Sequence, residues 1–151
     1  MIYLGIDPGK SGAFAFLSDN GFASVYAFDE AAFISNLRLY TRLKPEEIQL
    51  KCMLEKVGAM PGQGVTSMFS FGMNYGWIQG VLTAEGVSYE LVTPQKWKKE
   101  FGVTADKNTS IEVCKRLFPG VNLKRTERCK KDDDGIAEAL LLAEFARRHM
   151  K

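Results

Sequence analysis

The N-terminal segment constrains the fold of this chain more than any other. An apolar run over residues 2–6 ends at Asp7, and Pro8 and Gly9 stop the strand directly afterwards. A second apolar run at 13–17 predicts a strand that returns antiparallel through a glycine-containing turn. A carboxylate in an apolar strand is costly to desolvate unless a positive charge compensates it. Asp7 therefore predicts either a turn cap or a cation site.

The rest of the chain alternates between strand and helix signals. Further strands are expected at 22–28, 49–54 and 87–92, and helices at 30–43, 66–84, 94–99 and 136–149. One more helix is expected between a cap at Thr104 or Asp106 and a stop at Pro119. This order predicts an α/β fold with a mixed five-stranded sheet flanked by helices. At 151 residues, without repeats or linkers, the chain is expected to form a single domain over residues 1–151.

Composition narrows the compartment and the kind of site. No apolar run is long enough to cross a bilayer, and the N-terminal residues lack the features of a secretory signal. The three cysteines lie far apart without zinc spacing, so a cytoplasmic protein with free thiols and no membrane contact is expected. His149 is the only histidine, which argues against a histidine-rich metal site and a serine–histidine triad. Any metal would therefore be held by oxygen ligands.

Positive charge is concentrated in one stretch of the chain. Residues 96–131 hold eleven Lys or Arg and four Asp or Glu, a local charge of +7, whereas the remainder carries −5 of the net +2. Such a split is expected when one face meets a polyanion and another gathers carboxylates. A solvated basic face would give the same counts, so both interpretations are open at this point.

Four carboxylates outside that stretch are placed to meet. Asp7 ends the first strand and Glu55 ends the fourth, and neighbouring strands would project both acids from one end of the sheet. Asp134 and Glu138 are four apart and share a face of the last helix. Acids that converge repel one another unless cations lie among them, and Mg²⁺ and Mn²⁺ favour such oxygen ligands. The alternatives are that helix acids simply favour the helix dipole or pair with lysine.

Four motifs occur in order along the chain. They are Gly5-Ile6-Asp7-Pro8-Gly9, the apolar strand ending at Glu55, Ala105-Asp106-Lys107, and the run from Asp134 to Leu140. Together they resemble the motifs of RuvC-type Holliday junction resolvases, in a phage- or organelle-like branch, and the resemblance covers nearly the whole chain. It implies an RNase H-like fold and a homodimer. Its two active sites would nick opposed strands of a four-way DNA junction and leave 5′-phosphate and 3′-hydroxyl ends.

The resemblance also assigns roles to particular residues. The family's first aspartate falls on Asp7, its strand-four glutamate on Glu55, and its last acid on Glu138 in place of the usual aspartate. Its lysine near the scissile phosphate falls on Lys107. The acids, with Asp134, would hold Mg²⁺ or Mn²⁺, two ions per active site, which clamp the attacking water and the leaving oxygen. These five residues are the expected catalytic set.

The sequence departs from the family pattern at two positions. An acid is usual three residues before the last one, where this chain has Gly135, so Asp134 is the expected substitute and Asp133 the reserve. The usual aromatic three residues after the strand-four glutamate is absent, because that position is Gly58. Candidates for its role in wedging the junction open are Met60, Met68 and Phe69.

Basic and glycine-rich surfaces predict two kinds of partner. The expected contacts with DNA backbones, which make affinity fall with salt, are Lys96, Lys98, Lys99, Lys115 and Arg116, together with the segment 124–131. Trp77 and Trp97 are expected in the core, with stacking on bases as the alternative. Gly72, Gly76 and Gly80 share one helix face, which predicts either the homodimer surface or packing against the chain's own sheet.

Three other functions fit parts of the pattern. An RNase H-fold nuclease for RNA–DNA hybrids or other branched DNA would need the same acids. A non-catalytic DNA-binding module would keep the fold without the chemistry, and Gly135 leaves room for that reading. A nucleotide-binding protein like the sugar kinases and actins also opens with a strand, an aspartate and glycines, but that fold normally needs two domains and a far longer chain.

Overall fold

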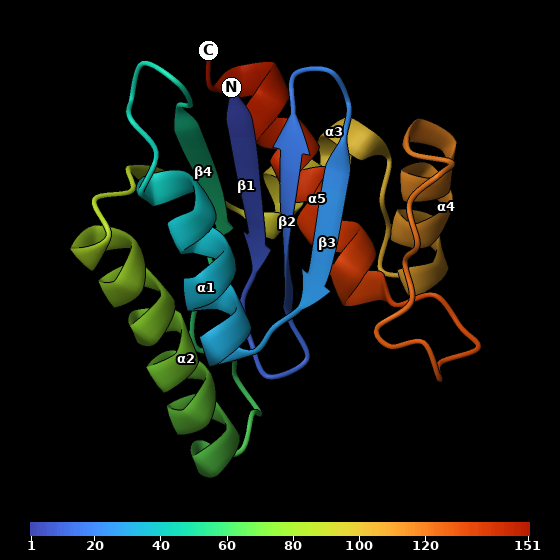
Figure 1. The fold of residues 1–151 in the computed structure, drawn as a ribbon. Helices are drawn as coiled ribbons and strands as arrows, with labels where there is room; N and C mark the ends of the chain where they lie inside the picture. The colour runs from blue at the N-terminus through green and yellow to red at the C-terminus, as the bar shows by residue number, and fades with distance from the viewer.

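Five strands form one mixed sheet in the order β3-β2-β1-β4-β5 (Figure 1). The computed structural model describes all 151 residues. The strands are β1 (Ile2–Asp7), β2 (Ala13–Ser18), β3 (Ala23–Ala27), β4 (Leu50–Glu55) and β5 (Tyr89–Val92). β1 pairs antiparallel with β2 and parallel with β4, while β3 and β5 form the edges. The predicted mixed five-stranded sheet, with its first and fourth strands side by side, is confirmed.

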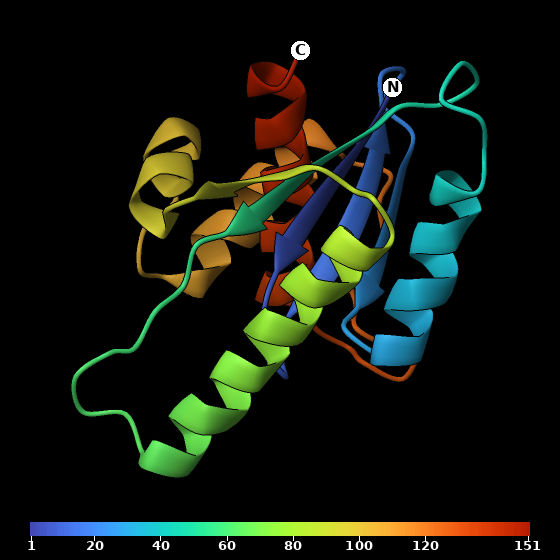
Figure 2. The same cartoon turned by 90° about the vertical axis from the view of Figure 1, so that its left-hand side faces the viewer.

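Five helices cover the two faces of this sheet. They are α1 (Glu30–Thr41), α2 (Val65–Ala84), α3 (Pro94–Phe101), α4 (Lys107–Leu117) and α5 (Asp134–His149). α1 and α2 lie on one face, and α3, α4 and α5 lie on the other, as the two perpendicular views show (Figures 1 and 2). All the predicted elements are present, with ends that differ by a few residues. None of the helices is both long and apolar enough to span a membrane.

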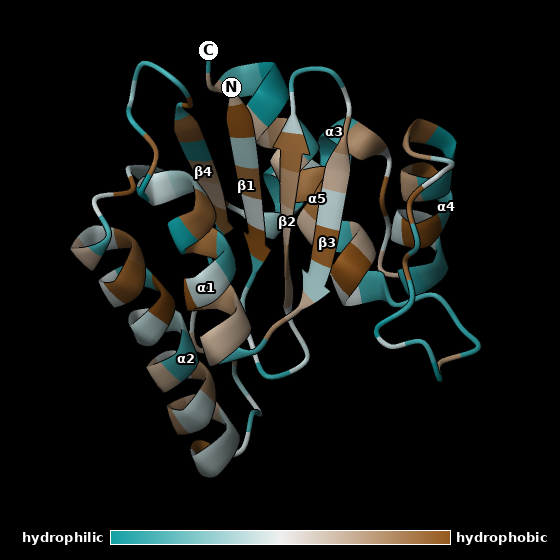
Figure 3. Cartoon of the chain, in the orientation of Figure 1, coloured by the Kyte–Doolittle hydropathy of each residue, from teal (hydrophilic) through white to brown (hydrophobic).

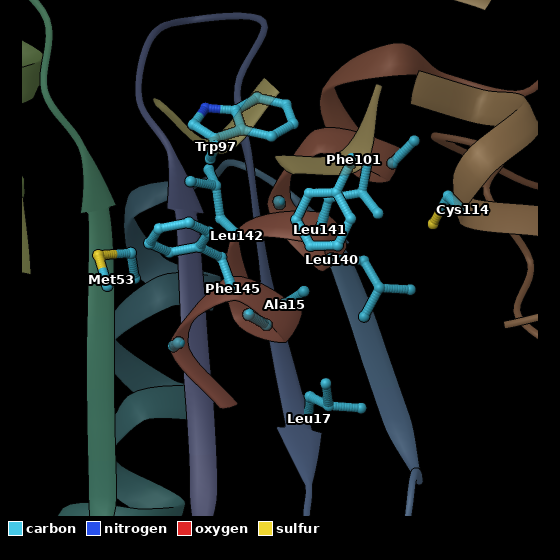
Figure 4. Close-up of a cluster of buried hydrophobic side chains, with 14 of the residues drawn as sticks. Ala15, Leu17, Met53, Trp97, Phe101, Cys114, Leu140, Leu141, Leu142 and Phe145 are labelled. Carbon is cyan, nitrogen blue, oxygen red and sulfur yellow. The ribbon is translucent and has the colours of Figure 1, made fainter. Parts of the chain in front are cut away.

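Alternating side chains of the strands build a core on each face of the sheet. Toward α1 and α2, Leu4 and Ile6 of β1 are fully buried together with Phe33 of α1. Toward α5, Met53 of β4 and Trp97 of α3 belong to the second cluster (Figure 4). The hydropathy colouring agrees with a buried sheet, because β1, β2 and β4 are largely apolar, whereas the loop between α4 and α5 is largely hydrophilic (Figure 3).

Helix α5 lies directly against β1. A Cβ atom on Gly5 would overlap the backbone of Ala139 and Ala143, so only glycine lets the helix come this close to the strand. Nearly every residue of α5 from Gly135 to Ala146 is buried. The first turns of α5 are thereby fixed beside the carboxyl end of β1.

A tight turn joins β1 to β2. Gly9 has a φ of 119°, a left-handed conformation that favours glycine, and its carbonyl oxygen accepts from the Gly12 N–H over 3.0 Å. A Cβ atom on Gly12 would overlap the carbonyl oxygen of Asp7. From the other side, the Gly9 N–H donates to Oδ1 of Asn74 in α2 over 2.8 Å. The backbone that follows Asp7 is therefore held by its own glycines and by α2.

Candidate active site

Four carboxylates gather at one end of the sheet. The parallel pairing of β1 with β4 places Asp7 and Glu55 at the ends of neighbouring strands. Asp134 and Glu138 come from the first two turns of α5, and the charges of all three other acids act on Asp7. These four residues are called the acid cluster below. The structure thus places the four predicted acids at the same end of the sheet, near enough for the other three charges to act on Asp7.

Asp7 lies at the centre of the acid cluster. Burial raises the pKa of the Asp7 carboxyl well above its usual range, and the nearby charges of Glu55, Glu138 and Asp134 raise it further. The Lys98 ammonium acts in the opposite direction. The cluster therefore holds more negative charge than its surroundings compensate, which is the condition that favours a bound cation.

Glu55 is held by a tryptophan. The residue is 7% exposed, and the indole Nε1–H of Trp97 donates to its Oε2 over 2.6 Å. Burial raises the pKa of Glu55, while this hydrogen bond and the Lys98 ammonium lower it. Trp97 is wholly buried, so its predicted place in the core is confirmed and the alternative of base stacking is wrong for it.

Lys98 supplies the positive charge among the acids. Its Nζ lies 3.7 Å from Oε1 of Glu138. Burial raises the pKa of Glu138 to about 7, with repulsion from Glu55 and Asp134 adding to it and Lys98 opposing it. The only ammonium in contact with Glu138 is thus one that sequence reasoning had assigned to DNA contacts.

The position of Lys98 follows from the way α3 docks. Trp97 and Phe101 are the buried residues of this short helix, and Lys98 follows Trp97 directly at the edge of the buried face. The helical spacing of the two aromatic residues was a signal for that edge position. Which groups lie opposite the edge depends on tertiary packing, so the contact with Glu138 was missed.

Lys107 lies at the rim of the acid cluster, beside Asp134. It is the first residue of α4, whose N-cap Asp106 accepts a hydrogen bond from the Asn108 N–H. The Lys107 Nζ is 4.0 Å from Oδ2 of Asp134, and the side chain is 80% exposed. An exposed ammonium beside the acids is free to reach an anionic ligand.

Asp133, the second candidate for a metal ligand on α5, instead caps the helix and pairs with an arginine. Its Oδ1 accepts from the Ile136 N–H over 3.0 Å and so caps α5, and both its oxygens accept from the Arg125 guanidinium. Although burial raises its pKa, the hydrogen bond from Arg125 holds the pKa of Asp133 below its usual value. A Cβ atom on Gly135 would lie 2.8 Å from the Ser11 carbonyl oxygen. The side chain of an acid at position 135 therefore has no room. Of the two candidates, Asp134 belongs to the acid cluster and Asp133 does not.

Two solved structures of RuvC from Thermus thermophilus share this architecture. The RuvC complex with a Holliday junction substrate matches 98% of this chain and 95% of its own chain, with a TM-score of 0.57 and 15% sequence identity. A second Thermus thermophilus RuvC structure matches 98% of this chain and 96% of its own chain, with a TM-score of 0.54 and 16% sequence identity. The chain has the RuvC fold. No protein-family model matches the sequence, and no curated protein is similar to it.

The comparison confirms the predicted α/β, RNase H-like fold, and it confirms the resemblance to RuvC at the level of the fold. Within the RuvC fold, the acid cluster fits divalent cations by its donor type, because carboxylate oxygens are the ligands that Mg²⁺ and Mn²⁺ prefer. No three Asp, Glu, Cys or His side chains lie close enough together to enclose one ion. The fit to a divalent cation therefore rests on the carboxylate donor atoms and on the excess of negative charge in the acid cluster.

Apart from the segment 124–131, which lies between α4 and α5, the remaining basic residues predicted to contact DNA lie on α3 and α4. Lys96, Lys99 and Arg116 are exposed. Lys115 is exposed too, and its Nζ lies 2.5 Å from Oδ2 of Asp132. Both helices lie on the same face of the sheet as α5, so these charges share a side of the molecule with two of the clustered acids (Figure 2).

A cavity of about 440 Å³ is lined by the loop after β4, the start of α3 and Phe71 of α2. Gly58 lines it in place of the aromatic residue that the resemblance leads one to expect. Of the three wedge candidates, Met60 and Phe69 are 63% and 70% exposed, whereas Met68 is half-buried. Of these candidates for wedging a junction open, only Met60 and Phe69 are therefore accessible to DNA.

The outward face of α2 is apolar and unpartnered. Its exposed apolar residues are Val65, Phe69 and Met73. Cβ atoms on Gly72, Gly76 and Gly80 would meet nothing within 4 Å. The N-terminal half of α2 extends past the sheet in both views (Figures 1 and 2). Packing of the glycine face against the chain's own sheet, one of the two predicted alternatives, is therefore wrong.

Proposed function

We propose that this protein is a metal-dependent endonuclease that resolves four-way DNA junctions by paired symmetric nicks. The observation that carries the proposal is the acid cluster at the ends of β1 and β4, with Lys98 among the acids and Lys107 at the rim, in the RuvC fold. Carboxylates that raise one another's pKa destabilise the metal-free protein. Such an arrangement is typical of a functional site.

In this proposal the four acids hold two divalent cations, Mg²⁺ or Mn²⁺. When bound, such ions supply an activated water and stabilise the leaving oxygen of the phosphodiester. Asp7 would help to hold both ions, Glu55 would serve the leaving-oxygen side, and Asp134 and Glu138 would serve the side of the attacking water. The hydrogen bond from Trp97 orients Glu55 for its part. The cleaved strand would carry a 5′-phosphate.

Basic residues of the chain bind and place the DNA. Lys107 offsets charge on the scissile phosphate, and its exposed ammonium beside Asp134 supports that role. Backbone contacts are assigned to Lys96, Lys98, Lys99, Lys115 and Arg116. One RuvC structure is a complex with a Holliday junction substrate, which supports branched DNA as the ligand of this chain. Affinity for DNA should fall steeply with salt, because such contacts release counterions.

A homodimer would set two such sites against opposed strands of one junction. The unpartnered face of α2 supports this assembly, since glycines at 72, 76 and 80 permit close approach of a second helix. Residues 1–151 would form one nuclease domain per subunit, working in the cytoplasm.

The deciding experiment is cleavage of a labelled four-way junction, a matching duplex and an RNA–DNA hybrid, with Mg²⁺ or Mn²⁺, by the wild type and Asp7→Asn. Paired symmetric nicks in the junction alone, absent in the variant, are expected. The Asp7→Asn protein should still bind the junction, because removing one negative charge does not weaken attraction for a polyanion. Hybrid cutting would make the protein a ribonuclease, and binding without any cutting would make it a DNA-binding module.

A further inference from the structure

The guanidinium of Arg125 connects two segments that carry the acid cluster. Its Nε–H and Nη2–H donate to Oδ2 and Oδ1 of Asp133 over 3.0 and 3.1 Å. The same Nη2 donates to the carbonyl oxygens of Ser11 and Gly12 over 2.5 and 3.1 Å. One side chain thus makes a forked ion pair and two backbone contacts at once.

These partners lie directly beside the proposed metal ligands. Ser11 and Gly12 belong to the turn that begins after Asp7, while Asp133 caps α5 and precedes Asp134. β1 and α5 are distant in sequence, and each brings acids to the cluster. Arg125 ties the turn at the end of β1 to the cap at the start of α5.

The packing around this contact is close and depends on Gly135. A Cβ atom there would lie 2.8 Å from the Ser11 oxygen, 3.1 Å from Oδ1 of Asp133 and 3.3 Å from Nη2 of Arg125. The turn and the helix therefore touch only because this position has no side chain. The departure from the family pattern at Gly135 leaves space for the contact that Arg125 makes.

The other basic residues of the segment 124–131 are more exposed than Arg125. Lys124, Arg128, Lys130 and Lys131 are exposed, whereas Arg125 is half-buried with a side chain that is 25% exposed. The segment is anchored by Leu123, which is buried and whose carbonyl oxygen accepts from the Asp133 N–H over 2.7 Å. Arg125 is therefore placed toward the protein, and its charge is already paired.

We propose that Arg125 is a positioning residue of the nuclease site, which sets the distance between Asp7 and the acids of α5, and that it is not a DNA contact. The inference rests on the proposed function for its effect on cleavage. Lysine cannot replace it, because a single ammonium cannot form the fork to Asp133 and reach two carbonyl oxygens as well.

The test compares Arg125→Lys with Arg38→Lys in the full chain. Arg38 also makes a close pair with a carboxylate, Glu85, at 2.7 Å, but it lies on α1 on the opposite face of the sheet. Arg125→Lys should cut the junction about 10- to 100-fold more slowly at saturating protein, the cost of a small misplacement of catalytic groups. Its affinity for the junction, measured by fluorescence anisotropy without metal, should stay within about twofold of the wild type, because the charge is kept. Arg38→Lys should keep both values.

Two further variants make the outcome unambiguous. Gly135→Ala, which pushes the turn away from the helix without changing the number of charges, should slow cleavage in the same way. Arg128→Gln, a change of an exposed residue in the same segment, should weaken junction binding instead. Equal cleavage by Arg125→Lys and Arg38→Lys, or a loss confined to binding, would overturn the assignment.

Hydrogen exchange separates this inference from the proposed function. In the metal-free protein, Arg125→Lys should exchange the Gly12 and Ile136 amide hydrogens faster than the wild type, while Arg38→Lys should not. If the wild type cuts no junction, the proposed function fails, and the exchange rates still decide whether Arg125 joins the turn to the helix. Unchanged exchange at both amides would refute the connection.

Discussion

Trp97 fixes one acid of the candidate site, because its indole N–H donates to Oε2 of Glu55 over 2.6 Å. The ring is wholly buried in the cluster that also holds Met53 and much of α5 (Figure 4). A tightly packed ring has little freedom to move, so the carboxylate that it contacts is held in one direction. This hydrogen bond therefore connects a residue of the hydrophobic core with a residue of the proposed active site.

Trp97→Phe tests this relationship, since it keeps an aromatic ring and removes the donor. We expect the protein to lose about 1.5–3 kcal/mol of stability, the range for a hydrogen bond to a charged group, and to cut more slowly. Urea denaturation and single-turnover cleavage would measure the two effects. Trp77→Phe is the control, because Trp77 packs on Phe28 and Phe33 with ring centroids 5.9 and 6.0 Å away. Wild-type cleavage by Trp97→Phe would show that Glu55 needs no such support.

The pKa of Glu138 predicts how stability changes with pH in the metal-free protein. Burial raises this pKa from 4.5 to about 7, so between these values the folded state binds the proton more tightly than the unfolded state. The contribution of Glu138 to stability is therefore full below pH 4.5 and is lost as the pH rises through 7. We expect the stability of the wild type, relative to Glu138→Gln, to fall across this window in a chelating buffer. Parallel stability curves for the two proteins would contradict the shift.

Local sequence patterns were enough to predict the strands and the meeting of the acids. Asp7 and Glu55 each end an apolar run, and strands of that kind pair in the interior of a sheet, so their shared end followed from the pattern. Asp134 and Glu138 followed from helical spacing. Each of these signals spans only a few residues, which is why it can be recognised in the sequence.

Contacts between distant segments could not be predicted. The partner of Lys98 depends on where α3 docks, and that position is set by the buried rings of Trp97 and Phe101. In the sequence, Arg125 is one basic residue among several. Only the fold brings it to Ser11, which is far away in the sequence. The absence of an acid at Gly135 was visible, but its cause, the neighbouring turn, was not.

Lys98→Met should change how the acid cluster binds cations. In the metal-free protein the Lys98 ammonium, 3.7 Å from Oε1 of Glu138, is the positive charge among the acids. Removing it takes away a competitor, so we expect several-fold tighter binding of Mn²⁺ by calorimetric titration. Without metal, the pKa of Glu138 should rise further, because Lys98 opposes that rise. Lys99→Met, a change of an exposed neighbour on the same helix, should leave the Mn²⁺ affinity unchanged, and an equal effect of both variants would mean that overall charge alone decides it.

The outward face of α2 predicts how the protein assembles. Met73 is 61% exposed on this face, and Leu39 of α1 is 65% exposed elsewhere, so the two offer a matched pair of substitutions. Met73→Asp should convert a dimer into a monomer in sedimentation at micromolar concentration, because it places a charge in an apolar interface. Leu39→Asp should leave the dimer intact. Monomeric wild type, or equal effects of the two variants, would exclude this face.

Gly76→Leu separates assembly from folding. Nothing lies within 4 Å of a Cβ atom at this position, so the larger side chain fits the isolated subunit. Replacing a glycine inside a helix should even stabilise the subunit, by up to about 1 kcal/mol. The same side chain would block the close approach of a second helix, so we expect a stable monomer that binds a junction weakly and no longer makes paired nicks. A dimeric Gly76→Leu protein that still nicks both strands would show that the subunits meet through another surface.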